Sequence, residues 1–149
     1  SISAMKKPSP YLTFAGAIPF VACALLILVG IDTIPRLGAS VYVLSTYGLI
    51  IASFMAGAQW GNHLSLNDGD MWSVGLPILS NVITIVLWFG FLILPTLGFM
   101  WLLILGFLSL LMIDYGLYRA HIIDATYFKV RKYVTLIVVL ALALSAYQL

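Results

Sequence analysis

The sequence is short of charge. Only 8% of its residues are charged, and all five acidic residues are aspartate, so glutamate is missing altogether. Soluble globular domains carry about 25% charged residues. With 63% hydrophobic residues and a mean hydropathy of +1.13, this composition excludes an ordinary soluble domain. It is typical of an integral membrane protein.

Cysteine and histidine are also scarce. The one cysteine, Cys23, excludes a disulfide within the chain, and its apolar surroundings favour a small packing residue. The two histidines form neither an HxxxH nor an HxxE pattern. Only weak metal-ligand candidates therefore remain, namely His63, His121 and Asp114, since imidazole and carboxylate suit zinc, iron or copper. The sequence does not identify a cofactor.

Recognisable catalytic patterns are absent as well. The chain has no GxSxG motif, no P-loop and no pair of carboxylates within one apolar run. This absence favours a non-enzymatic protein, with a metal-dependent membrane enzyme as the least favoured alternative. A run of basic and aromatic residues between 119 and 133 does not indicate nucleic-acid binding, because beside a membrane anionic lipid headgroups are the better-matched partner.

Long apolar runs dominate what is present. A transmembrane helix needs about 20 mainly apolar residues. We predict an all-α fold, a polytopic integral membrane protein whose 149 residues form a single bundle of five transmembrane helices. The predicted spans are residues 11–30, 41–62, 71–91, 97–118 and 133–149, and residues 119–132 form an interfacial basic connector.

Three local features refine these spans. Pro19 lies inside the first span and should kink it, which frees the carbonyl of Ala15 for a partner inside the bundle. Asp70 is well placed to cap the third span. The fifth span is apolar nearly all round, so we expect it at the periphery of the bundle, largely against lipid.

The distribution of basic residues predicts the orientation. With five spans, Lys6, Lys7, Arg119, Lys129, Arg131 and Lys132 fall on one side of the membrane, and Arg36 falls on the other. Basic loops favour the cytoplasmic side. The N-terminus should therefore be cytoplasmic and the C-terminus external.

The second span carries a stripe of small residues and a polar end. Ser53, Gly57 and Gly61 recur every four residues, and such flat faces let transmembrane helices pack closely. We predict that this stripe is a helix-packing face. The last turn of the span and the residue after it add Gln59, Trp60 and His63.

Topology predicts that this polar end meets a second one. Asp114, Tyr118 and His121 share a face at the end of the fourth span, and both spans run from outside to inside. In the third span Asn81 lies near mid-membrane and should face protein. The candidate ligand-binding residues are Gln59, Trp60, His63, Asn81, Asp114, Tyr118, Arg119, His121, Tyr127 and Arg131. The alternatives are a structural ion pair of Asp114 with Arg119 or Arg131, and a proton relay.

Several motifs together resemble one family. They are GAIPF at residues 16–20, YGxxIxSFxxGxxWG at 47–61, the span with Pro77, the helix end at Asp114, and YFKVRKYVT at 127–135. The chain resembles an uncharacterised family of bacterial inner-membrane proteins that includes mitochondrial transmembrane protein 69. The resemblance implies five spans in the bacterial inner (cytoplasmic) membrane or mitochondrial inner membrane, and no activity. The five-span format is also similar to the tryptophan-rich sensory proteins, but their WYxxLxKPxWxPP-like loop is missing here.

These observations predict a non-enzymatic inner-membrane protein, an accessory or assembly subunit of a larger membrane complex such as a respiratory one. Its partners would be another membrane protein and lipids, with anionic headgroups at the basic connector. The alternative is a small-molecule, quinone or lipid-binding protein or transporter with a pocket between the second, third and fourth spans.

Overall fold

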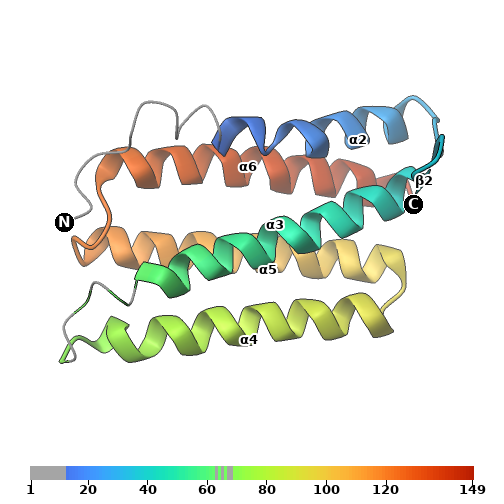
Figure 1. Cartoon of the computed structure of the whole chain (residues 1–149). Coiled ribbons are helices and arrows are strands. Elements are labelled where there is room, and N and C mark those ends of the chain that lie inside the picture. Colours follow the sequence, from blue (N-terminus) through green and yellow to red (C-terminus); the bar gives the residue numbers. More distant parts are fainter. Residues whose placement is uncertain (1–12, 63, 65, 67–68) are drawn as a thin grey trace.

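The computed structural model describes residues 13–62, 64, 66 and 69–149, and these form a bundle of helices (Figure 1). In chain order the elements are α2 (Ile18–Leu28), β1 (Thr33–Ile34), β2 (Gly38–Ala39), α3 (Ser40–Asn62), α4 (Met71–Ile93), α5 (Thr96–Arg119) and α6 (Ala125–Tyr147). The two short strands pair antiparallel in the loop between α2 and α3.

Within the described residues, four helices are long and apolar enough to cross a membrane, α3 to α6, and residues 13–28 form a shorter apolar helical segment. The expectation of a helical membrane bundle is met at this level, and the observed α3, α4 and α5 begin and end within two residues of the predicted spans. Asp70 caps α4 as predicted, because its Oδ1 accepts the backbone N–H of Trp72 at 2.9 Å.

The start of α6 corrects the predicted connector. This helix begins at Ala125, eight residues before the expected start at 133, so residues 125–132 are helical rather than interfacial loop. The reason is a second cap: Asp124 Oδ1 accepts the backbone N–H of Tyr127 at 2.7 Å. The link from α5 to α6 shrinks to residues 120–124, and Arg131 moves from a loop to the inner face of a helix.

The first helical segment breaks where Pro19 predicts a kink. Residues 13–15 are helical, residues 16 and 17 form a turn, and Pro19 stands in the first turn of α2. The carbonyl that gains a partner belongs to Gly16, one residue after the predicted Ala15. It accepts the hydroxyl of Tyr47 on α3 at 2.8 Å, which satisfies in the bundle a group that lipid cannot satisfy.

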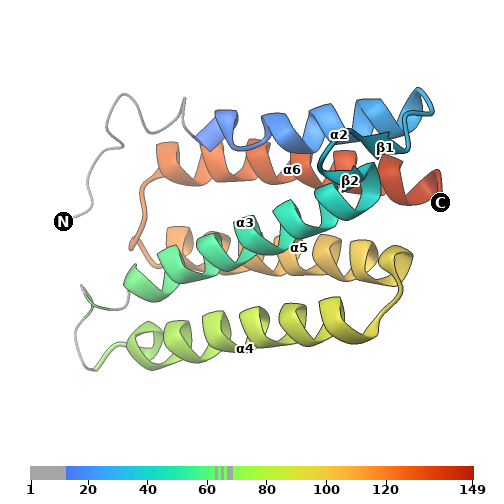
Figure 2. The same ribbon diagram turned by 45° about the vertical axis from the view of Figure 1, so that its right-hand side comes forward.

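The helices form an unequal arrangement. Figures 1 and 2 show α3 and α5 in the middle, α2 and α6 together on one side, and α4 alone on the other. Contacts join α6 to both α5 and α2, whereas α4 contacts α3 and α5. The core lies between α2, α3, α5 and α6, where Phe20, Leu103 and Phe107 are fully buried.

The expected peripheral position of the fifth span is wrong. In the most apolar stretch of α6, 44% of the residues are buried, compared with 22% in α4. The helix turns Arg131, Thr135 and Ser145 inward, all of them buried. In lipid, polar side chains are favoured inside the bundle, so these few residues orient the helix more strongly than its many apolar ones.

The predicted packing stripe on α3 is also wrong. A Cβ added at Gly57 or at Gly61 would meet nothing within 4 Å, and Gly57 is exposed beside Phe54, which is 74% exposed. The close approach occurs on the opposite side of the helix at Gly48, where a Cβ would come within 2.7 Å of a methyl group of Leu103. The helix has two faces rich in small residues, and its buried polar residues Ser45 and Gln59 decide which one faces the bundle.

Candidate functional site

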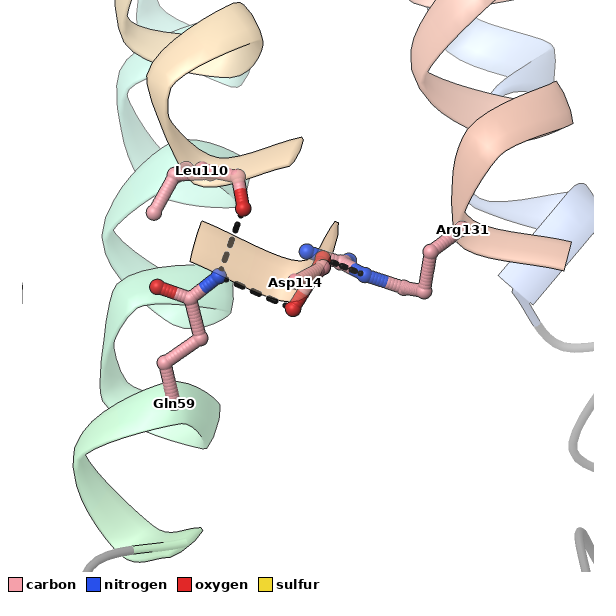
Figure 3. A network of polar contacts seen from close by, with 4 residues as sticks. All are labelled: Gln59, Leu110, Asp114 and Arg131. Atoms are coloured by element: carbon pink, nitrogen blue, oxygen red, sulfur yellow. Dashed lines mark hydrogen bonds and ion pairs between the residues drawn. The ribbon is translucent and has the colours of Figure 1, made fainter. Parts of the chain in front are cut away.

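A polar network links three helices at the end of the bundle where α3 and α5 finish. Asp114 of α5 is completely buried, and its Oδ2 accepts the Nε–H of Arg131 from α6 at 2.9 Å. Its Oδ1 accepts from the Gln59 amide of α3 at 3.0 Å, and the same amide nitrogen donates to the Leu110 carbonyl at 2.8 Å. Figure 3 shows Asp114 between the other two side chains.

This network is a strong link between helices. Asp114 and Arg131 carry opposite charges, and Arg131 is only 7% exposed. Removing one partner of a buried ion pair costs about 3–5 kcal/mol, because the other charge stays uncompensated. The predicted meeting of the α3 and α5 polar ends is therefore present between Gln59 and Asp114, and Arg131 is the arginine that pairs with the aspartate.

The other candidates at this end lie outside the network. Tyr118 stacks on Phe128 of α6, with ring centroids 5.1 Å apart and an interplanar angle of 8°. Arg119 is exposed, and its Nη1 donates to the Tyr115 hydroxyl at 3.4 Å. His121 is exposed and has a positive φ of 61°, a conformation that ends α5. Their common position on one helix end did not bring these side chains to Asp114.

The candidates on the sides of α3 and α4 also point elsewhere. Trp60 is 41% exposed on α3. Asn81 is exposed on α4 and donates its side-chain amide to the Pro77 carbonyl of its own helix at 2.7 Å. It therefore faces away from the other described helices of this chain, and the expectation that it faces protein stays a prediction. Bonding to its own helix satisfies one amide hydrogen without a neighbour, which allows this outward position.

A metal site is not formed by the residues described. Among them, no group of three histidine, cysteine, aspartate or glutamate side chains lies close enough to hold an ion. Asp114 instead uses both carboxylate oxygens in the network, and His121 is exposed. The third weak candidate, His63, lies outside the described residues.

A cavity of about 330 Å³ lies beside the network, and its lining residues come from the first helical segment, α2, α3, α5 and α6. This cavity does not lie where a pocket was expected, between the second, third and fourth spans, because no residue of α4 lines it. A smaller pocket of about 140 Å³ does lie between α4 and α5. The reason that α4 is absent from the larger cavity is that it packs outside α3 and α5. By contrast, the ribbons of α2 and α3 lie close beside β2 and diverge toward the opposite end of the bundle (Figure 1). Most of the lining is apolar, including Phe20, Phe54 and Val138.

Most of the polar lining lies on α6, and Thr13 of the first helical segment adds one more polar residue. Tyr127, Arg131 and Thr135 follow one another at helical spacing along the side of α6 that faces the cavity. Tyr127 and Arg131 are thus two predicted candidates that the structure brings to one site. Of the described residues that line the cavity, Arg131 is the one with a formal charge.

Thr135 has an unusual state. It is fully buried, and its hydroxyl has no hydrogen-bond partner. Hydroxyls in apolar helices ordinarily bond to a carbonyl of the preceding turn. Ser45, Thr84, Ser109 and Ser145 all do so here, at 2.8–2.9 Å. An unpaired buried hydroxyl is costly. Because Thr135 is a lining residue of the cavity, rotation of its side chain toward that space would let a bound molecule supply the missing partner.

Thr135 was missed as a candidate because the fifth span was assigned to lipid. A signal was present in the sequence: Tyr127, Arg131 and Thr135 fall at i, i+4 and i+8, which is one stripe if the helix extends back to Asp124. Recognising the Asp124 cap would have extended the helix and shown this stripe. The cavity between α2, α3, α5 and α6 has no comparable signal.

Comparison with known proteins identifies the family. A search of curated proteins and a search of solved structures gave no match. Residues 5–147, nearly the entire chain, match the model of a family described as "Protein of unknown function (DUF3429)". This match confirms the resemblance to an uncharacterised family, while the link to mitochondrial transmembrane protein 69 stays a prediction. The chain, whose described part contains four membrane-length apolar helices, belongs to the DUF3429 family.

Proposed function

We propose that the protein binds a small amphiphilic molecule from the membrane in the cavity between α2, α3, α5 and α6. The observation that carries the proposal is the unpaired hydroxyl of Thr135 in the wall of this apolar cavity, beside the guanidinium-bearing Arg131. Ligand sites are mostly apolar hollows of about 300–1,000 Å³ with a few polar groups that orient the ligand. The cavity, at about 330 Å³, is at the lower end of that range.

The ion pair supports this role by holding the cavity wall in place. The Asp114 carboxylate holds Arg131 in place by accepting its Nε–H, and the Gln59 amide holds Asp114 by donating to it. The polar end of the cavity is therefore preorganised. Preorganisation lowers the entropy lost on binding. Gln59 and Asp114 then act as structural support for the site, and Arg131 is the network member that lines the cavity.

We place this site in the bacterial inner membrane, near the cytoplasmic side. Among the described residues, Arg119, Lys129 and Lys132 are exposed at the end of the bundle with the ion pair, and Arg36 lies at the opposite end. Basic residues favour the cytoplasmic side and attract anionic lipid headgroups. A cytoplasmic N-terminus and an external C-terminus follow from this orientation.

Filling the cavity tests the proposal. Ala58 lines it, whereas the neighbouring Gly57 faces open space. Phenylalanine at position 58 should occupy the volume and abolish retention of small amphiphiles, measured by mass spectrometry of the intact protein released from mild detergent. The matched control, Gly57→Phe, should retain them as the wild type does. Equal retention by both variants, or no retained molecule in the wild type, contradicts the proposal.

A second function, as an accessory subunit of a membrane complex, is favoured by Asn81. Its side chain is exposed on α4 near the middle of a membrane-length helix, and only one amide hydrogen is used within that helix. An amide facing lipid lacks partners, and interhelical hydrogen bonds from asparagine contribute to transmembrane association. A partner helix packed along α4 would supply the missing bonds.

Replacing Asn81 by valine tests this second function. Cross-linking in native membranes, followed by identification of the adducts, should give a discrete adduct through α4 in the wild type and lose it in Asn81→Val. Thr84→Val is the control, because Thr84 already donates to Ser80. An adduct that survives Asn81→Val, or that is never formed, contradicts an accessory role through this face.

A further inference from the structure

We infer that the headgroup of the bound amphiphile is uncharged and presents a carbonyl oxygen to Arg131 and Thr135. This inference rests on the proposed function and specifies its ligand. Long-chain quinones and acyl esters of glycerol share this chemistry, and the experiment below distinguishes these two sources.

The cavity wall offers hydrogen-bond donors. A guanidinium carries five N–H groups, and only the Nε–H of Arg131 is donated to Asp114. The Thr135 hydroxyl is unpaired, and Tyr127 brings a phenol to the same wall. A matching headgroup must therefore accept hydrogen bonds. A carbonyl oxygen accepts two at once, as from a guanidinium and a hydroxyl on successive turns of one helix.

The ion pair argues against a charged headgroup. Arg131 is the one formal charge among the described residues that line the cavity, and Asp114 already compensates it. An anionic headgroup would compete with a carboxylate that is completely buried and leave one net negative charge in an apolar region. A cationic headgroup would face a guanidinium. Uncompensated charge in such a region is strongly unfavourable, whereas a neutral acceptor adds hydrogen bonds without adding charge.

The remaining wall suits an apolar tail. The apolar lining includes Phe20, Met55, Phe107 and Val138, together with Phe54, which is largely exposed. A tail that leaves past Phe54 would enter the surrounding lipid. The volume is sufficient for a headgroup and the first part of a chain, but not for a whole lipid.

The test compares probes that share a dodecyl-length chain and differ only in the headgroup. Methyl laurate presents a neutral carbonyl, laurate an anion, dodecyltrimethylammonium a cation, and dodecane no headgroup. The purified full chain in lipid nanodiscs is titrated with each probe, and displacement of a photoactivatable methyl-ester analogue is measured. We expect methyl laurate to displace the analogue at least about tenfold more strongly than the other three, the value of one hydrogen bond.

Thr135→Val is the decisive variant, because valine keeps the shape of the side chain and removes the hydroxyl. We expect binding of methyl laurate to weaken about tenfold, while thermal stability without a probe is unchanged or higher, since an unpaired buried hydroxyl is lost. Ser145→Ala is the matched control on the same helix. Ser145 is equally buried but donates to Ala141, so this change should leave probe binding unaffected.

The outcomes distinguish failure of the inferred headgroup chemistry from failure of the proposed binding site. Stronger displacement by laurate or by dodecane, blocked by Ala58→Phe, overturns the neutral carbonyl and leaves the cavity as a binding site. No displacement by any probe overturns the proposed function as well. If methyl laurate binds as expected, decylubiquinone and monolaurin are compared next: tighter binding of the first supports a quinone source, and of the second a glycerolipid source.

Discussion

Helices α4 and α6 make an instructive pair, because both have 23 residues and pack beside the central α5, but their surroundings differ greatly. α4 has no ionisable side chain, yet it is the less buried and turns Asn81 outward. α6 carries two lysines and an arginine, yet it buries Arg131, Thr135 and Ser145 along one side. Their difference shows that in a membrane the polar residues orient a helix, since apolar surface is equally stable against lipid or protein.

The largest expected effect comes from breaking the ion pair that attaches α6. Replacing Arg131 by methionine leaves Asp114 buried without its partner, which should destabilise the bundle by about 3–5 kcal/mol. Unfolding in detergent by a denaturant titration measures this. Adding Asp114→Leu should recover much of the loss, because the uncompensated charge is then gone. If the double variant is no more stable than Arg131→Met, the uncompensated charge is not the cause of the loss. The ion pair and its hydrogen bonds would then themselves hold α6 in place.

The next largest difference is expected between leucine-to-alanine substitutions on the two helices, in their effect on the free energy of unfolding. Leu142 of α6 is completely buried, so Leu142→Ala should cost about 2–5 kcal/mol through lost contacts and a cavity. Leu92 of α4 is 57% exposed, and we expect Leu92→Ala to change the free energy of unfolding by less than about 0.5 kcal/mol. The same titration in detergent compares them. Equal losses at both positions would mean that α4 is covered by protein as fully as α6.

The smallest effects are expected from alanine substitutions on the two faces of α3. They test whether the face with the buried polar residues is the one that packs in the bundle. A methyl group at Gly48 would press on Leu103, which is fully buried and has little room to move, so Gly48→Ala should cost about 1–3 kcal/mol. At Gly57 the space is open, and Gly57→Ala should stabilise the helix by up to about 1 kcal/mol. Melting temperatures of the two variants measure the difference in sign. If Gly57→Ala instead destabilises the protein, the stripe of Ser53, Gly57 and Gly61 would be a packing face after all.

The positions of the long helices followed from composition, because apolar runs of membrane length and the aspartate before α4 are local signals. The Gln59–Asp114 contact was likewise anticipated, since topology sets the depth of each helix end. The rotation of each helix about its axis could not be predicted in the same way. Helix α3 has two faces rich in small residues, and only contacts with Leu103 and Asp114 distinguish them. The inward orientation of the polar side of α6 was not predicted either, because the basic residues after Asp124 favour a connector over the first turns of a helix.

By itself, the sequence determined a helical, membrane-length architecture and the three residue types of the polar network, since hydropathy and helix capping act over a few neighbouring residues. The tertiary structure decided that Arg131 pairs with Asp114, that Asn81 faces outward, and that a cavity lies between α2, α3, α5 and α6. The physical reason is that rotation and separation of helices depend on side chains distant in the chain. The burial of Thr135 is the plainest result of that dependence, because it follows from the packing of α6 against the other helices.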